Sequence, residues 1–308
     1  MLIKIGTRGS KLALAQARQV LAKLKKLNPQ ERFKLVVIKT YGDEYQSVEI
    51  FKKTNVGVFT KEIEKKLLNG TIDIAVHSLK DLPTDLPKGL KLAAIPKRAA
   101  VEDVLISRAR HTLEGLPRGA RVGTGSPRRK SQLRLLRPDF EIADLRGNLD
   151  TRVAKVIKEK SLDAVMVARA GVERLGKFKR YCRVVPATQV LPAVGQGALG
   201  LEVRSQDART KKIARLLNDS VTEALTGAER RFLKELRGGC RVPVGIFSRK
   251  KGNKIHLTAA VYSVKNASFV KARISRPFSQ AALAGKALAR RLLKKGARRF
   301  LLEARAGL

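Results

Sequence analysis

The sequence predicts an α/β fold with two doubly wound domains and a small C-terminal α+β domain that contains an antiparallel sheet. Three observations lead to this prediction. Strand and helix patterns alternate in two separate series within the first two-thirds of the chain, and the pattern changes near residue 217. The length of 308 residues also exceeds what one hydrophobic core usually holds.

The first series occupies the amino-terminal quarter of the chain. The segments MLIKIG (1–6), FKLVVIKT (33–40) and TIDIAVHS (71–78) have the apolar patterns of strands. Ser10 is placed to cap a helix whose apolar residues recur every three or four positions. TKEIEKKLLNG (60–70) predicts a second helix, which ends at an Asn-Gly pair.

The second series repeats this alternation after residue 120. Strands are predicted in ARVGTGS (120–126), FEIADLRG (140–147) and LDAVMVA (162–168), with helices in PRRKSQLRLL (127–136) and LDTRVAKVIKE (149–159). Such alternation is typical of parallel sheets with helices on both faces.

The last part of the chain has a different pattern. A helix, VTEALTGAERRFLKEL (221–236), precedes three strands with the alternation of an antiparallel sheet, at 244–250, 254–263 and 269–276. A second helix is predicted at 279–296. We therefore predict a small α+β domain here.

These patterns set the expected domain boundaries. Domain 1 is predicted to comprise residues 1–96 plus 196–216, domain 2 residues 97–195, and domain 3 residues 217–308.

Composition indicates a soluble globular protein, with 44% hydrophobic and 30% charged residues. No apolar run reaches the ~18 residues of a membrane span, and the first residues lack the apolar core of a signal peptide. Two cysteines cannot build a disulfide framework, and their spacing suits no zinc motif. We expect a cytoplasmic protein with free thiols, no metal site and no membrane partner.

The net charge of +40 first suggests a nucleic-acid partner. The basic residues are spread along the whole chain, however, and only 5% of residues are aromatic, so few side chains can stack on bases. No nucleic-acid-binding motif is present. We therefore expect no specific nucleic-acid partner, and the charge exceeds what a pocket for a small anion needs.

Four polar stretches follow predicted strands or open predicted helices. Ligands of open α/β sheets bind beyond the carboxyl ends of strands, and helix N-termini and arginines bind anions. The stretches could also be capped helices and polar turns without a ligand, but four together favour an anion site. They are GTRGS (6–10), HSLKD (77–81), GTGSPRR (123–129) and LRGNLDTR (145–152).

Two further residues are candidates for chemistry. Asp81 lies among basic groups, and with three histidines in the chain a carboxylate is the more natural acid–base group. Cys240 lies in LRGGCRVPVG (236–245), where two glycines and a proline indicate a loop. From this segment alone, the favoured interpretation is that Cys240 is a small buried hydrophobic residue, as most free cysteines are.

Six separated motifs in this order resemble the porphobilinogen deaminases (hydroxymethylbilane synthases), from residue 3 to about residue 300. The last motif resembles the segment that carries the family's cofactor. The motifs are IGTRGSKLALAQA, DIAVHSLKDLP, VGTGSPRR, LRGNLDTR, LPAVGQGALGLE and ERRFLKELRGGCRVPVG.

The resemblance implies a transferase of haem biosynthesis that condenses four porphobilinogen molecules head to tail into hydroxymethylbilane and releases ammonia. It implies a dipyrromethane cofactor bound to Cys240 through a thioether, formed by attack of a thiolate on the electrophilic methylene-pyrrole. It also implies that Asp81 transfers protons and stabilises positive charge on the pyrrole nitrogens. The partners would be porphobilinogen and the growing polypyrrole chain, and the protein would be a monomer.

The resemblance further implies which residues bind the acidic side chains of the pyrroles. The cofactor-binding set is Cys240, Lys80, Asp81, Ser126, Arg128, Arg129, Arg146, Gly147, Arg152 and Gln196. The substrate-binding set is Arg8, Ser10, Lys52, Arg146, Arg152 and Arg174.

One segment departs from the family pattern. Residues 52–59 read KKTNVGVF, where Lys52 matches a basic position but the usual glycine pair is absent, and Val56 stands where a second Lys is common.

Two alternatives of other classes remain. A non-catalytic anion-binding protein is suggested by the paired α/β domains, which resemble periplasmic binding proteins. It would need neither Asp81 nor the cysteine loop. A nucleic-acid-binding protein is supported by charge alone. A covalent adduct of two linked pyrroles in the intact mass would exclude both alternatives.

Overall fold

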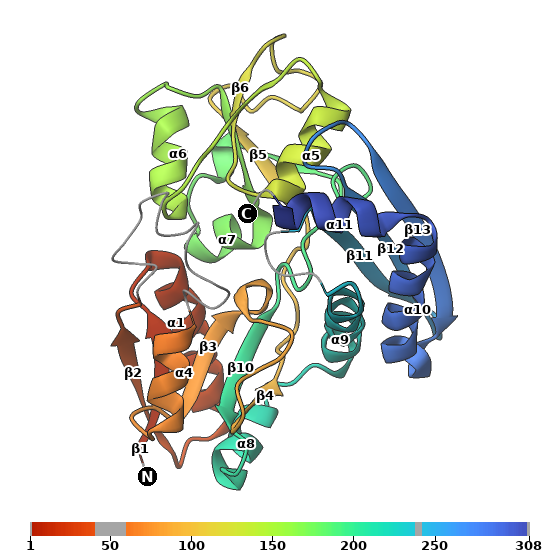
Figure 1. Ribbon diagram of the computed structural model, residues 1–308. Helices are drawn as coiled ribbons and strands as arrows, with labels where there is room; N and C mark the ends of the chain where they lie inside the picture. Colours follow the sequence, from red (N-terminus) through yellow and green to blue (C-terminus); the bar gives the residue numbers. More distant parts are fainter. Residues whose placement is uncertain (1, 41–59, 238–241, 307–308) are drawn as a thin grey trace. The chain divides into compact units, whose positions relative to one another are not determined.

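The computed structural model describes residues 2–40, 60–237 and 242–306 of the chain. It contains two five-stranded sheets, each with flanking helices, and a three-stranded antiparallel sheet (Figure 1). The chain forms two compact units, of which the first comprises Met1–Ala99 and Ala198–Ala224, and the second comprises Ala100–Gly197 and Leu225–Leu308. The fold class is α/β as predicted, and the three-domain division at the boundaries given above stays a prediction.

The sheet of the first unit has the strand order β2-β1-β3-β10-β4. Strand β1 is parallel to β2 and β3, whereas β10 is antiparallel to β3 and β4. The elements are β1 (Leu2–Arg8), α1 (Lys11–Leu27), β2 (Arg32–Ile38), α4 (Lys61–Leu68), β3 (Ile74–Ser78), η1 (Leu79–Asp81), β4 (Leu90–Ala94), β10 (Leu199–Arg204) and α8 (Ala208–Arg215).

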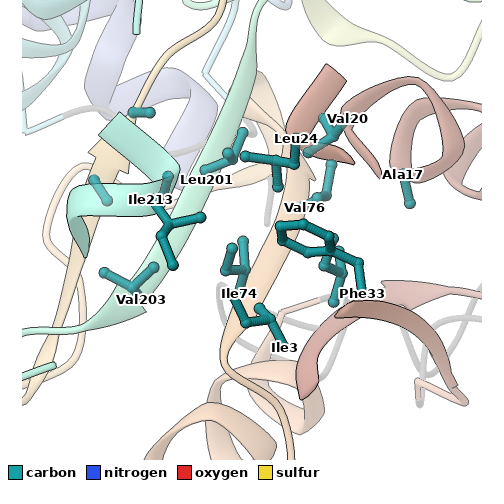
Figure 2. Packing of buried hydrophobic residues seen from close by; sticks show 14 of the residues in the cluster. Ile3, Ala17, Val20, Leu24, Phe33, Ile74, Val76, Leu201, Val203 and Ile213 are labelled. Atoms are coloured by element: carbon teal, nitrogen blue, oxygen red, sulfur yellow. The ribbon is translucent and has the colours of Figure 1, made fainter. Parts of the chain in front are cut away.

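Alternating side chains of the first sheet enter two hydrophobic clusters. Figure 2 shows the first, in which Val20 and Leu24 of α1 pack with Ile74 and Val76 of β3. Residue Ala75, between these two on the strand, belongs to the second cluster, with side chains of α4. Both faces of the sheet are therefore covered by helices, as the period of two along a strand requires.

The larger sheet of the second unit has the order β7-β6-β8-β5-β9. Strand β6 is parallel to β7 and β8, and β5 is antiparallel to β8 and β9. This is the same arrangement as in the first sheet. The elements are β5 (Asp103–Ser107), β6 (Arg121–Gly123), α5 (Pro127–Leu136), β7 (Glu141–Ala143), α6 (Leu149–Ile157), β8 (Ala164–Ala168), α7 (Arg169–Leu175), η2 (Lys179–Tyr181) and β9 (Cys182–Val185).

The sheets are mixed, because in each of them one strand, β10 or β5, runs opposite to the other four. The expectation of parallel sheets therefore fails at this one strand. Strand β5 is the first strand after the chain leaves the residues of the first unit, and β10 is the first after it leaves those of the second. Each enters its sheet antiparallel to its neighbours. The alternation of strands and helices along the sequence indicates consecutive β-α-β units. It does not indicate the direction of a strand, such as β5 or β10, that joins the sheet from another unit of the chain.

The C-terminal part contains the predicted antiparallel sheet, in the order β11-β12-β13. Helix α10 contacts β12 and β13, and α11 contacts β12. Gly285 brings α10 against α9, because a Cβ at this position would lie 2.1 Å from the Ala228 carbonyl oxygen. The elements are α9 (Ser220–Glu235), β11 (Val244–Lys251), β12 (Lys254–Tyr262), β13 (Phe269–Pro277), η3 (Phe278–Gln280), α10 (Ala281–Lys294) and α11 (Ala297–Ala306).

Among the described residues, no helix has both the length and the apolar character needed to cross a bilayer.

Candidate active site in two anion-binding edges

The predicted functional turns of the first unit lie at one edge of its sheet. Strands β1 and β3 are parallel neighbours, so their carboxyl ends, at Arg8 and Ser78, meet at the same edge. Ser10 caps α1, because its hydroxyl accepts a hydrogen bond from the Ala13 amide at 3.3 Å. Helix α1 is also tied to the end of β3, since Gln16 Nε2 lies 3.0 Å from Ser78 Oγ.

Asp81 is presented by a short turn that is anchored at its first residue. Leu79 is 1% exposed, and its amide donates to the Ala198 carbonyl at 3.0 Å. Lys80 and Asp81 follow in the same turn, and the Asp81 side chain is exposed. Within the described part of the chain, the Asp81 carboxylate has no hydrogen bond or ion pair with another residue. A rigid turn therefore offers an ionisable carboxyl group to solvent.

His77 belongs to the same stretch of sequence, but its side chain is buried. Its Nε2 lies 3.1 Å from Glu202 Oε2, and the two residues are 5% and 0% exposed. Glu64 of α4 is buried nearby, and burial together with the charge of Glu202 raises the pKa of its carboxyl group. The first unit therefore has buried acidic groups beneath an edge that exposes Asp81.

The second unit brings its two predicted turns together in the same way. Thr124, after β6, donates its amide to the Ala143 carbonyl at 2.9 Å. A Cβ on Gly125 would lie 2.5 Å from the Leu145 carbonyl oxygen, so the turns can approach this closely only with glycine here. The following residue, Ser126, caps α5 by accepting from the Arg129 amide at 3.5 Å.

Gly147 takes a conformation that favours glycine, with φ at +96°. Its carbonyl accepts a hydrogen bond from Arg152 Nε at 2.8 Å, which holds that guanidinium group against the turn. Arg146, the residue before Gly147, is exposed. Because β6 and β7 are parallel neighbours, their carboxyl ends meet, and the two turns lie at the same edge of the sheet.

Arg128 and Arg129 are buried against an acidic residue that the sequence analysis did not identify. Asp103, at the start of β5, is 0% exposed, with Oδ2 at 2.8 Å from Arg128 Nη2 and Oδ1 at 2.7 Å from Arg129 Nη2. Burial raises the pKa of Asp103, but the two guanidinium charges outweigh it and hold the pKa well below its usual range. The available signal was an aspartate at the head of a hydrophobic run, DVLIS, in a strongly basic chain.

Gln196 joins this buried group. Its Nε2 donates to Asp103 Oδ1 at 3.0 Å and to the Val101 carbonyl at 2.7 Å. Arg174 of α7 contacts the residue that follows Gln196, since its guanidinium group donates to the Gly197 carbonyl at 2.7 Å. Burial lowers the pKa of Arg174 to about 10, so the side chain stays cationic at neutral pH.

Two predicted site residues, Lys52 and Cys240, lie outside the described residues. The other thiol is described. Cys182 Sγ donates to the Phe178 carbonyl at 3.2 Å, and burial raises the pKa of this thiol.

Both units therefore place basic groups and helix N-termini at the carboxyl ends of parallel strands, and the first adds an exposed carboxylate. These features define an α/β enzyme class that binds acidic ligands and performs acid–base chemistry on them. Two family models match the chain. One, described as porphobilinogen deaminase, dipyromethane cofactor binding domain, matches residues 3–212, and the other, described as the C-terminal domain, matches residues 224–294.

Curated relatives match over nearly their full length. A porphobilinogen deaminase of Syntrophus aciditrophicus is 47% identical over 98% of each chain. One of Desulforamulus reducens is 42% identical over 99% of this chain and 98% of the relative. The chain belongs to the porphobilinogen deaminase family. It is a transferase, a hydroxymethylbilane synthase that condenses four porphobilinogen molecules and uses a dipyrromethane cofactor in tetrapyrrole biosynthesis.

A solved periplasmic binding protein of Salmonella typhimurium, described as having high arginine specificity, has 15% identity and a TM-score of 0.40. The match covers 72% of this chain and 93% of that chain.

The second unit contains donors that suit the acidic side chains of a dipyrromethane. Arg128 Nε and Arg129 Nε are buried, and neither has a hydrogen-bond partner in the described part of the chain, although the terminal nitrogens bind Asp103. A guanidinium N–H is a strong donor to a carboxylate. The residues present therefore fit a ligand that carries acetate and propionate groups.

Proposed function

We propose that Asp81 is the carboxylate that performs the proton transfers of the condensation and stabilises positive charge on the pyrrole nitrogens. The observation that best supports this proposal is that the Asp81 carboxyl group is exposed and has no partner among the described residues. It lies on a turn that Leu79 anchors. A carboxylate that is not neutralised by its own protein can act on the developing cation of a substrate. Preorganised groups of this kind stabilise charge in a transition state.

Basic groups at the same edge bind and orient the acidic substrate. Arg8, the capping residue Ser10 and Lys80 belong to adjacent carboxyl ends of the first sheet, and Lys52 would join them from outside the described residues. Each pyrrole carries an acetate and a propionate, so the growing chain accumulates carboxylates. Cationic and N-terminal donors at fixed positions favour such a ligand.

In the second unit, Ser126, Arg146, Gly147 and Arg152 form the corresponding edge, and Arg174 lies on another segment of that unit. Arg128, Arg129 and Gln196 contribute in a different way. Their contacts with Asp103 fix the guanidinium groups so that the remaining Nε–H donors keep one direction. When bound, the dipyrromethane supplies the free pyrrole carbon on which the new chain is built.

We further propose that Cys240 attaches the cofactor. The chain has two cysteines, and a raised pKa makes Cys182 the poorer thiolate nucleophile. In the sequence two glycines precede Cys240, and residues without a side chain are compatible with a bulky substituent on their neighbour.

The role of Asp81 is tested with Asp81→Asn, which keeps the shape and removes the charge and the proton acceptor. Turnover of porphobilinogen should fall by ~10²–10³-fold, as for loss of one preorganised group. The melting temperature should stay unchanged, because no internal partner is lost. Asp85→Asn, on the same loop, is the matched control and should keep parent activity. Parent-like turnover in Asp81→Asn would exclude it as the catalytic carboxylate.

The role of Cys240 is tested by intact mass. Cys240→Ala should have the mass of the bare polypeptide, whereas Cys182→Ala should retain the adduct, with a modest loss of stability from its half-buried site. The Cys240 variant should also melt at a lower temperature, because a bound cofactor favours the native state. An adduct that survives in Cys240→Ala and disappears in Cys182→Ala would reverse the assignment.

We also propose that the protein is a cytoplasmic monomer. Two cysteines are too few for a disulfide framework, which supports the cytoplasm. Sedimentation of the purified protein tests the monomer, since a concentration-dependent dimer would contradict it.

A further inference from the structure

The excess of basic over acidic residues is especially large in the C-terminal part of the chain. Residues 244–308 contain 16 Lys and Arg and one acidic residue, Glu303, whereas the whole chain contains 66 and 26. Of the 16, fourteen are exposed, and Lys271 and Lys286 are partly exposed. The charge excess that the enzymatic function leaves unexplained is therefore concentrated on β11–β13, α10 and α11.

These cations have almost no internal counter-charge. In the described residues from 242 to 306, Arg290 forms the one ion pair to a carboxylate, with Glu235 at 3.0 Å. Glu303 instead accepts a hydrogen bond from the Ser263 hydroxyl. In the first unit, by contrast, Arg204 binds both Asp73 and Asp207 within 2.9 Å. Cations that lack carboxylates on their own chain favour an external polyanion.

The strand register places several of these groups on one face of the three-stranded sheet. Ile255, Leu257 and Ala259 of β12 are buried, and helices α10 and α11 lie beside this sheet (Figure 1). On the other face of β12, His256 and Thr258 are partly exposed, whereas Ala260 and Tyr262 are buried. This second face is therefore open at His256 and Thr258 and covered at the end of β12.

Register pairs extend this open face onto the neighbouring strands. Thr258 pairs with Phe247 of β11 and Arg273 of β13, and His256 pairs with Arg249. Lys271 lies two residues from Arg273 on the same face, about 7 Å along the strand. Lys271 and Arg273 therefore place two positive charges on the same face of the edge strand β13.

The edge of the sheet carries two more cations. Arg291 Nη1 donates to the Arg273 carbonyl at 3.3 Å, and Lys295 Nζ to the Lys271 carbonyl at 3.5 Å. Helix α10 therefore adds a second basic row beside the first. We name Arg249, Lys271, Arg273, Arg291 and Lys295 the C-terminal basic surface.

Two aromatic residues share the open face with these cations. Phe247 is partly buried, because it packs against Leu191, Ala260 and Tyr262, whereas Phe269, opposite Tyr262 in the register, is 47% exposed. The rings of Phe269 and Tyr262 lie 5.8 Å apart between centroids, so Tyr262 supports Phe269 from the side on the same face of the sheet. An exposed aromatic ring beside cations on a sheet is a surface on which an unpaired base can stack.

We propose that the C-terminal basic surface binds single-stranded nucleic acid, through its phosphates and without sequence preference, with Phe269 as the stacking position. The cations would bind successive phosphates, and no base edge is read. The exposed ring of Phe269 favours a single strand over a duplex, whose bases are already stacked. The proposal is independent of the catalytic assignments above.

The test measures fluorescence anisotropy of the full-length protein with a labelled mixed-sequence single-stranded oligonucleotide, at several salt concentrations. The test variant is the double charge reversal Lys271→Glu with Arg273→Glu. Its matched control is Lys23→Glu with Lys26→Glu, two exposed lysines of α1 that change the net charge equally. Melting temperature and porphobilinogen turnover report whether each variant is folded.

We expect the test variant to lose at least tenfold in affinity at low salt. The slope of log affinity against log salt should shrink by about 1.4, for two phosphate contacts at about 0.7 each on a single strand. The control should change affinity less than threefold at 0.1 M salt, where the Debye length is about 10 Å. Equal losses in test and control would mean a general charge effect and would overturn the proposal.

A second variant, Phe269→Ser, separates nucleic acid from other polyanions. It should weaken oligonucleotide binding about fivefold or more, as loss of one stacking contact does, and leave binding of inorganic polyphosphate unchanged. Tighter binding to duplex, to polyphosphate or to phosphatidylglycerol vesicles than to the single strand would refute the assignment of the partner. If the charge reversal does not fold, Lys271→Gln with Arg273→Gln replaces it, with Lys23→Gln with Lys26→Gln as control.

Discussion

The two five-stranded sheets share one strand order and differ in the charges buried within them. In the first sheet, Glu202 pairs with His77, and Glu64 is buried nearby. In the second, Asp103 lies between Arg128 and Arg129. The shared topology determines that functional turns meet at the carboxyl ends of parallel strands. The buried charges determine what lies behind each edge, acidic groups in one and fixed guanidinium groups in the other.

The largest expected effect is loss of the central carboxylate of the second sheet. Asp103→Asn leaves two buried guanidinium groups without their counter-charge, and breaking a buried ion pair on one side costs about 3–5 kcal/mol. The free energy of unfolding, measured by urea denaturation, should fall by this amount. The comparison variant Glu202→Gln should lose less, because a glutamine side chain can still form a hydrogen bond with His77 Nε2.

The free energy of unfolding at acidic pH provides a further test of the role of Asp103. The pKa of its carboxyl group is lower in the folded state than the usual value near 3.9. The ionised Asp103 carboxylate therefore stabilises the folded protein above a pH of about 4, and this stabilisation is lost as the pH falls below that value. The stability difference between parent and Asp103→Asn should shrink in that window, and a difference that stays constant down to the lowest accessible pH would contradict the ion-pair interpretation.

An intermediate effect is expected from the turns that follow the first parallel strand of each sheet. Gly125→Ala would place a Cβ 2.5 Å from the Leu145 carbonyl oxygen, whereas in Gly9→Ala the nearest atom is Val37 Cγ1 at 3.4 Å. Overpacking usually costs about 1–3 kcal/mol. Thermal unfolding should show a clear loss for Gly125→Ala and little change for Gly9→Ala. Equal effects would mean that the two edges are built alike.

The smallest effect concerns Glu64 and has the opposite pH dependence to Asp103. Burial raises the pKa of its carboxyl group in the folded protein. The contribution of this group to the free energy of unfolding is therefore fully present below the unfolded pKa of about 4.3, and it is lost as the pH rises through the pKa of the folded state. Glu64→Gln should therefore stabilise the protein at pH 7 and have little effect near pH 4. Urea denaturation at both pH values measures this, and a stability loss at pH 7 would show that the charged carboxylate is needed.

Local patterns predicted most of the elements that build the candidate site. Period-two and period-3.6 hydrophobicity indicated β1, β3, β6 and β8 with the helices beside them, and a serine before each helix indicated the caps of α1 and α5. Patterns of this kind are local, so the sequence can report them directly. Strands β4, β5, β9 and β10 and helices α7, α8 and α11 were not predicted, since short segments with long-range partners lack such a signal.

The sequence by itself determined the family, the alternation of strands and helices, and the identity of the basic turns. Only the tertiary structure decided that Arg128 and Arg129 are buried on Asp103, and that His77 turns inward to Glu202 while Asp81 stays exposed. The physical reason is that Asp103 lies more than twenty residues from its partners, on a strand that runs antiparallel in its sheet. Local periodicity assigns a residue to a face, but the pairing of charges depends on which distant strands become neighbours.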